Sequence, residues 1–406
     1  MEEGRNFAWP VTSTNREDYL AICEWLDSYK EMIESKKIAI WGAGIRGTEF
    51  SIFLRRNNVT NIVFADNNEQ KWGGFIDEFP ILSPEELFKL KEKEPIIILI
   101  GTENSTEIEK QLEQQGYVRD NDFFVIQTKL YENYLKEFKR EYTKEILIVG
   151  DCAFSKIAVK DTNMNNLKEM LQAKSGEETT KVLAMHGMGE GAYYQIFKAQ
   201  MSVQMKPELL LLMVHPATLT VRNHVLPRTQ HAELLQKVYE ITGSADAEFG
   251  AYVERAWERS KNKQLEFFTK SADTKARNDM KARNYFRLNY MYDFDREVEG
   301  VVYFEKTLKK AKENNVKVVA FIPPINYEMG ERLLGEEFTE KYKKNVERIE
   351  EITKQYDAEL LDMSYRLKSE EFAEMYTPDE TANEKGRAIV AELMYEAICK
   401  FRKDKK

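Results

Sequence analysis

The stretch Glu145-Ile-Leu-Ile-Val-Gly-Asp-Cys-Ala-Phe154 decides how the second half of this chain folds. A short apolar run ends abruptly at Gly150, and Asp151 and Cys152 follow it. A buried parallel strand has this pattern when it ends at a functional loop. Because ligands of open α/β sheets bind beyond the carboxyl ends of the strands, we expect Cys152 to stand where a nucleophile would stand.

A series of strands and helices surrounds this stretch. The apolar runs expected to form strands are at 146–149, 181–185, 209–214, 316–322 and 359–361. Strands that alternate with helical segments predict a doubly wound parallel sheet. The polar region at about 228–313 predicts a helical insertion, because a loop of that length without structure would be unusual. A final amphipathic helix is expected at about 384–402.

A separate α/β series precedes residue 145, and a chain of 406 residues is too long for one typical core. Residues 1–35 form a leading helical segment, and the charged stretch at 131–144 is typical of a linker helix. Between them lies an expected domain at 36–130, and residues 145–406 form the second domain. The strands expected in the first domain are at 37–41, 61–65, 95–100 and 122–126.

The composition fits a globular protein, with 42% apolar and 32% charged residues. The net charge of −9 argues against nucleic acid as a partner. Three cysteines far apart in the sequence indicate a reducing compartment, no disulfide framework and no metal-binding cysteine pair. The apolar runs are shorter than the roughly 20 residues of a membrane helix, and the first residues lack a signal-peptide pattern. We therefore expect a cytoplasmic protein without a membrane span.

Gly42-x-Gly44-x-x-Gly47 follows the strand expected at 37–41 and precedes a helix. This spacing matches the dinucleotide-binding fingerprint, in which glycines let the backbone approach a pyrophosphate at a helix N-terminus. Asp66 ends the next strand, where a ribose-binding acid belongs. The alternative is that the glycines only let the helix pack on the strand. The sequence leaves both interpretations open.

The first domain also resembles a known family. Phe64-Ala-Asp-Asn-Asn-Glu-Gln-Lys-Trp-Gly73 and Ile81-Leu-Ser-Pro-Glu-Glu-Leu87 are similar to a small Rossmann-like domain attached to enzymes of bacterial surface-polysaccharide biosynthesis. The resemblance covers roughly residues 36–127. It implies an accessory domain, with a nucleotide or nucleotide-sugar as its candidate ligand.

The second domain, over about residues 145–402, resembles the SGNH/GDSL hydrolases. The resemblance rests on the Gly150-Asp-Cys152 block, where the family has Gly-Asp-Ser, on the strand order, and on the blocks Phe321-Ile-Pro-Pro-Ile-Asn326 and Pro378-Asp-Glu-Thr-Ala-Asn-Glu-Lys-Gly386. It implies a flavodoxin-like sheet and an acyl-ester hydrolase or acyltransferase. Asn326 is a candidate substrate contact, and a rigid turn explains it equally well.

The triad that this resemblance implies is incomplete. Aligning Asn383 and Gly386 with the family's last block puts Thr381 at the histidine position, and Asp379 lies one residue from the aspartate position. A threonine hydroxyl is not basic near neutral pH, so it cannot activate Cys152. The family's Gly-x-Asn-Asp block, which supplies an oxyanion donor, is also absent.

Other residues are candidates for the lost roles. His186 and His215 follow the strands at 181–185 and 209–214, so both are expected at the sheet edge that carries Cys152. Amides of the loop at 187–191, with Gly187 and Gly189, could hold an oxyanion. Asp151 is expected to cap a helix whose N-terminus lowers the pKa of the Cys152 thiol. The alternative is that Cys152 is a small buried hydrophobe.

Together these features predict an esterase or acyltransferase that acts on a carbohydrate in bacterial surface-polysaccharide biosynthesis or modification. The ester chemistry itself requires no cofactor. The alternative is a catalytically inactive domain that binds a glycan, a nucleotide-sugar or a partner enzyme.

Overall fold

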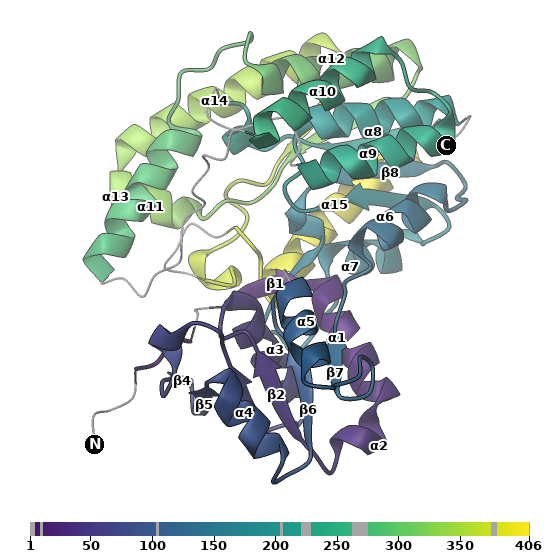
Figure 1. Cartoon of the computed structure of the whole chain (residues 1–406). Helices are drawn as coiled ribbons and strands as arrows, with labels where there is room; N and C mark the ends of the chain where they lie inside the picture. Colours follow the sequence, from purple (N-terminus) through teal and green to yellow (C-terminus); the bar gives the residue numbers. More distant parts are fainter. Residues whose placement is uncertain are drawn as a thin grey trace. The chain divides into compact units, whose positions relative to one another are not determined.

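The computed structural model describes residues 5–8, 11–102, 105–203, 206–220, 229–261, 275–374 and 380–405, and every statement below refers to these residues. The described chain divides into two compact units, with residues up to 129 in the first and those from Leu130 onward in the second. Both units are of the α/β class (Figure 1). No described helix combines the length and the apolar character needed to cross a bilayer.

The first unit is built on a six-stranded sheet. Its strands lie in the spatial order β4 (Phe75–Ile76), β5 (Phe79–Leu82), β3 (Ile62–Ala65), β2 (Lys37–Trp41), β6 (Ile96–Ile100) and β7 (Phe123–Val125). All neighbours pair in parallel except β4 and β5, which form an antiparallel edge. The four expected strands are confirmed. The β4–β5 hairpin was not predicted, because its strands are too short for a periodic pattern.

Helices surround this sheet at 16–28 (α1), 30–33 (α2), 45–56 (α3), 84–91 (α4) and 106–114 (α5), with a short turn η1 at Glu69–Lys71 and a short strand β1 at Ser13–Asn15. The leading segment is therefore two helices that break at Tyr29, preceded by a strand. The start of α4 shows how the sequence sets these boundaries. Ser83 and Glu86 form a reciprocal capping box, and Pro84 occupies the first helical position.

Packing leaves no space for a side chain at two of the three glycines of the motif that runs from the loop after β2 into α3. Gly42 has a φ of +119°, and a Cβ there would lie 2.9 Å from the carbonyl oxygen of Gly101. A Cβ on Gly47 would lie 1.9 Å from the carbonyl oxygen of Gly42. No atom lies within 4 Å of the place where a Cβ on Gly44 would stand. Packing therefore explains Gly42 and Gly47, and it leaves Gly44 facing open space.

We expect Gly47→Ala to lower the free energy of unfolding of the first unit by about 3 kcal/mol or more, because neither backbone segment can move aside cheaply. The matched variant Gly44→Ala should change it by about 1 kcal/mol or less. Urea unfolding followed by tryptophan fluorescence tests this, since Trp25, Trp41 and Trp72 report on the first unit. Equal stability of the two variants would contradict the packing explanation.

The second unit is built on a five-stranded, fully parallel sheet. Its strands lie in the order β10 (Thr180–Ala184), β8 (Ile146–Gly150), β11 (Leu209–Met213), β12 (Lys317–Ile322) and β13 (Glu359–Asp362). All five expected strands are confirmed. Numbered along the chain the order is 2-1-3-4-5, so the direction of winding reverses between β8 and β11.

Helices cover both faces of this sheet (Figure 1). The long helices are α6 (Leu130–Lys139), α7 (Leu167–Ser175), α8 (Glu190–Ser202), α9 (Thr229–Thr242), α10 (Ala247–Lys261), α11 (Lys275–Tyr290), α12 (Glu299–Glu313), α13 (Tyr327–Leu334), α14 (Glu336–Gln355) and α15 (Glu384–Asp404). Helix α8 packs against α12, and α7 packs against α15. Because parallel crossovers are right-handed, reversed winding puts α7 and α8 on opposite faces.

The region expected as a helical insertion forms α9, α10, α11 and α12 in its described parts. The segment expected as a linker helix at 131–144 is largely α6, which packs against β10 and α9 and so belongs to the second unit.

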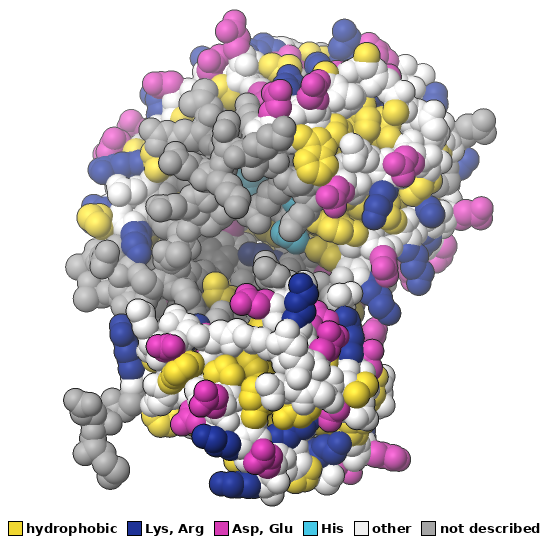
Figure 2. Space-filling view, viewed as in Figure 1, with side chains coloured by type: hydrophobic (Ala, Val, Ile, Leu, Met, Phe, Trp, Pro, Cys, Tyr) yellow, Lys and Arg dark blue, Asp and Glu magenta, His cyan; other side chains and the backbone are white. Residues whose placement is uncertain are grey.

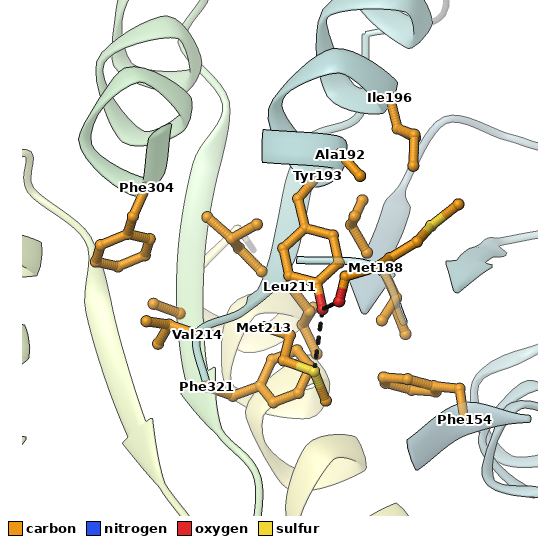
Figure 3. Close-up of a cluster of buried hydrophobic side chains, with 14 of the residues drawn as sticks. Phe154, Met188, Ala192, Tyr193, Ile196, Leu211, Met213, Val214, Phe304 and Phe321 are labelled. Atoms are coloured by element: carbon orange, nitrogen blue, oxygen red, sulfur yellow. Dashed lines mark hydrogen bonds between the residues drawn. The ribbon is translucent and has the colours of Figure 1, made fainter. Parts of the chain in front are cut away.

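The core of the second unit reaches the carboxyl ends of its strands (Figure 3). The ring of Tyr193, from α8, lies over Met213 at the end of β11, and Phe154 and Phe321 pack edge to face with their centroids 6.0 Å apart. The Tyr193 hydroxyl lies 3.2 Å from the carbonyl oxygen of Met188 and 3.6 Å from the Met213 sulfur. This buried side chain thereby ties the loop after β10 to the end of β11.

Candidate functional site

The sheet of the second unit places three predicted residues at one edge. Gly150 pairs with Ala184 and Val149 pairs with Leu212, so Cys152, His186 and His215 each follow their strand at the same level. Cys152 follows β8, which lies between β10 and β11, and His186 and His215 follow these two neighbouring strands. The winding reversal between β8 and β11 marks the crevice in which open α/β sheets bind ligands. Histidine side chains are visible from outside the second unit (Figure 2).

Cys152 lies in a short turn and does not begin an α-helix. The turn η2 covers Cys152–Phe154, and the Asp151 side chain caps it by accepting the Ala153 N–H at 2.9 Å. The chain then continues as strand β9 (Lys156–Ala158). The expectation of an α-helix after Asp151 is therefore wrong, and Asp151 caps this short turn instead. The turn is bent back because the buried Phe154 ring packs over Gly150.

His215 forms a buried pair with Glu380. The Nε2 atom of His215 lies 2.7 Å from Oε2 of Glu380, and Nδ1 accepts the backbone N–H of Ala217 at 3.1 Å. In the neutral ring, Nδ1 accepts the Ala217 N–H, so the ring proton is on Nε2, which donates it to Glu380. Burial lowers the pKa of His215, but the Glu380 carboxylate outweighs burial and raises that pKa to about 9. An imidazolium would have to break the contact with Ala217.

Glu380 is the site residue that sequence reasoning missed. The alignment with the family's last block drew attention to Thr381 and Asp379. Asp379 lies outside the described residues. Thr381 is buried, and its carbonyl oxygen accepts the N–H of Ala373. Glu380 lies next to Thr381, so the block still brings an acid to the site while the histidine comes from the end of β11. The sequence does contain an indication of this role, because the block at 378–386 carries the acidic residue Glu380.

His186 makes a different contact from His215. Its ring lies edge to face with the ring of His231 from α9, at a centroid distance of 5.8 Å. His215 in turn pairs with the carboxylate of Glu380 at 2.7 Å.

The loop between β10 and α8 leads directly to a helix N-terminus. Gly187 has a φ of +72°, and Gly189 caps α8. The first N–H groups of a helix lack intrahelical acceptors, so Gly191 and Ala192 offer donors at this edge. This geometry is compatible with the oxyanion role predicted for the loop.

Asn326 has a structural task. It is almost fully buried at the start of α13, where Oδ1 accepts the N–H of Met329 at 3.3 Å and the hydroxyl of Ser369 at 2.8 Å. Its Nδ2 has no acceptor among the described residues. The cap occupies the oxygen, so only the amide nitrogen is available to a substrate.

In the first unit, Asp66 points into the glycine loop. Its Oδ2 accepts the Ala43 N–H at 2.7 Å and the Lys71 ammonium at 2.9 Å, and its Oδ1 accepts the Asn68 N–H at 2.8 Å. Lys71 also donates to the carbonyl oxygen of Ala43 at 2.9 Å. A ribose hydroxyl would have to replace some of these contacts to bind Asp66. The described residues contain no cluster of three or more side chains suited to a metal ion.

Comparisons with known proteins found one matching family model and several distant solved structures. Residues 34–121 match the family model described as C2185-like, N-terminal. No curated protein matches the chain. A solved structure titled as a candidate acylhydrolase from Bacteroides fragilis NCTC 9343 is 10% identical, with 67% of this chain and 96% of that chain covered and a TM-score of 0.33. A GDSL-like lipase from Bacteroides thetaiotaomicron VPI-5482 is 11% identical, with 66% and 97% covered and a TM-score of 0.32. Structural similarity with TM-scores this low does not indicate the activity of this chain.

Proposed function

We propose that the second unit hydrolyses or transfers an acyl ester, with Cys152 as nucleophile, His215 as base and Glu380 as the acid that orients the base. The observation that carries this proposal is the 2.7 Å hydrogen bond between His215 and Glu380 at the end of the strand next to Cys152. A nucleophile, a base and an orienting acid are the parts that acyl transfer requires.

The chemistry follows from these three side chains. The step begins from neutral His215, which its raised pKa makes the minor form at neutral pH. The Cys152 thiol gives its proton to Nδ1 of the neutral ring, which releases the Ala217 N–H, and Glu380 stabilises the imidazolium. The thiolate attacks the acyl carbon, and its carbonyl electrons move to the oxygen, which the N–H groups at the start of α8 can hold. When the C–O bond breaks, the leaving alcohol takes the proton from His215. Water or a second alcohol then attacks the thioester with His215 again as base.

The proposed substrate is a carbohydrate ester of bacterial surface-polysaccharide biosynthesis or modification. This part rests on the sequence resemblance of the first unit to the accessory domain of such proteins. We also infer that the first unit takes a nucleotide or nucleotide-sugar at its glycine loop. The strand order there reverses between β2 and β6, next to the open space at Gly44, which supports a ligand at this place.

One observation favours a second candidate, a unit that binds a glycan, nucleotide-sugar or partner enzyme without turnover. Both ring nitrogens of His215 already have partners, so the base must exchange Ala217 for Cys152 before chemistry begins. Catalytic hydrogen bonds often form only when substrate is bound, so the contact with Ala217 does not exclude catalysis. An experiment must distinguish the two candidate functions.

The test is to trap the acyl group on the full chain. The protein is incubated with a generic acetyl ester or an O-acetylated sugar, quenched in acid, digested and analysed by mass spectrometry. We expect an acetyl group on the peptide that contains Cys152, and ester hydrolysis that disappears in Cys152→Ala. Cys399→Ala is the matched control and should keep full activity. Equal rates for wild type and Cys152→Ala, without an adduct at Cys152, would refute thiol catalysis and favour the binding candidate.

A further inference from the structure

A buried glutamate with an unusual hydrogen-bond pattern lies beside His215. Glu190 is the first residue of α8, and 1% of its surface is exposed. Its Oε1 lies 2.6 Å from the hydroxyl oxygen of Thr218. Its Oε2 has no hydrogen-bond partner among the described residues. A buried carboxylate with so little compensation would be costly.

The Thr218 hydroxyl settles where the proton is. Its oxygen lies 2.6 Å from Oε1 of Glu190 and also 2.6 Å from the carbonyl oxygen of His215. A hydroxyl has a single proton to donate, and a carbonyl oxygen can only accept. The contact with the carbonyl of His215 therefore uses the Thr218 proton. The equally short contact with Glu190 then requires a proton on the carboxyl group.

Packing holds Thr218 in this position. A Cβ on Gly300 of α12 would lie 2.6 Å from the carbonyl oxygen of Thr218, so the helix backbone passes directly beside it. This close approach of α12 fixes the backbone of Thr218.

We propose that Glu190 is a positioning residue that carries a proton in the folded protein and, through Thr218, holds the backbone of His215 in place. Its proton completes a chain from the Glu190 carboxyl to the Thr218 hydroxyl and on to the His215 carbonyl. The role in orienting a catalytic base rests on the proposed function, whereas the protonation of Glu190 does not.

Burial supports a neutral Glu190. Burial raises the pKa of Glu190 to about 7, although the contacts with Thr218 and His215 act to lower it. Two further titratable side chains interact electrostatically with Glu190. They are Tyr292, whose hydroxyl donates to the carbonyl oxygen of Pro216, and Tyr193 of α8, which also interacts with Asp151 and Cys152. Glu380 lies behind His215. Burial is thus the cause that favours the proton on Glu190, and it outweighs the attraction of the His215 ring.

Ionisation of Glu190 has a defined consequence. A carboxylate can only accept, so Thr218 would have to donate to it and release the carbonyl of His215. The folded pKa lies above the ordinary value of about 4.3, so Glu190 contributes less stability as the pH rises from there through about 7. In Glu190→Gln the amide can donate to Thr218 at every pH, and this part of the pH dependence should disappear.

The test is a carbon-13 NMR titration of the full chain with labelled glutamate carboxyl groups, which needs no substrate. We expect a signal with a midpoint near pH 7 that disappears in Glu190→Gln. Glu49→Gln is the control, because burial also raises the pKa of Glu49 to about 7, and its loss must leave the Glu190 signal unchanged. A Glu190 midpoint near 4.3, the value of an ordinary glutamate, would overturn the proposal.

A second variant tests the link to His215 and covers the case in which Glu190→Gln fails to fold. In wild type the ring signals of His215 should show an inflection at the Glu190 midpoint. In Thr218→Val this inflection should shrink to the part that the direct charge interaction of Glu190 with His215 transmits. An inflection of unchanged size without the hydroxyl would refute the positioning role. Absence of esterase activity would refute the proposed function alone, since neither NMR result depends on turnover.

Discussion

Glu380→Gln is expected to slow acyl transfer by about 10²–10⁴-fold, the range seen when the orienting acid of a triad loses its charge. The amide keeps the size of the side chain but cannot stabilise the imidazolium that forms when Cys152 gives up its proton. Glu380 is the main group that raises the pKa of His215 to about 9 against burial. Without it, burial should bring that pKa below its ordinary value of about 6.5.

Two measurements check this prediction. The rate of hydrolysis of an acetyl ester gives the catalytic effect, and a proton NMR titration of His215 gives the pKa. Glu370→Gln, the same change at an exposed site in the same segment, should alter neither. If the rate fell while the pKa of His215 stayed near 9, Glu380 would act in some way other than through the imidazolium.

The same variant has a pH-dependent effect on stability. His215 has a folded pKa above its unfolded value, so the pair with Glu380 stabilises fully below about pH 6.5, and this stabilisation is lost as the pH rises through about 9. The difference in free energy of unfolding between wild type and Glu380→Gln should therefore be largest at pH 6 and small near pH 10.

Arg387→Ala is expected to lower the free energy of unfolding of the second unit by about 3–5 kcal/mol, because it leaves a buried carboxylate without its partner. Arg387 and Asp161 form an ion pair at 2.6 Å, with side chains only 1% and 5% exposed. The guanidinium also donates to the carbonyl oxygens of Asn163, Asn165 and Ala382. Four backbone and side-chain groups would lose a donor together.

Hydrogen exchange of the β8 amides measures this effect in the second unit alone. The matched control is Lys400→Ala in the same helix, α15. Lys400 pairs with Glu359 at 2.6 Å, but these side chains are 61% and 59% exposed, so the loss should be far smaller than for Arg387→Ala. Similar costs for the two variants would show that burial of the Arg387 pair does not matter.

The Arg387 variant also bears on the site. Ala382 lies two residues beyond Glu380, and its carbonyl oxygen is held by Arg387. Asp161 in turn accepts the N–H of Glu384 at the start of α15. If this network places the segment that carries Glu380, Arg387→Ala should lower the pKa of His215 even where the protein remains folded.

Much of the fold could be read from local patterns. The apolar runs at 146–149 and 209–214 are strand-length and are followed by Gly150-Asp151 and by His215, and hydrophobic burial makes them into β8 and β11. Parallel pairing then carries Cys152 and His215 to one edge. The prediction failed after Asp151, where an expected helix is a short turn, because the side chain that bends it, Phe154, is drawn into the core.

The sequence by itself determined which strands form, that two histidines and a cysteine end neighbouring strands, and which loop is rich in glycine. These are properties of short segments, in which the periodicity of apolar side chains decides the structure. Only the tertiary structure decided that His215 pairs with Glu380, 165 residues away, and that Gly42 and Gly47 serve packing whereas Gly44 faces open space. Such contacts depend on strand register and helix packing, and no spacing along the chain encodes them.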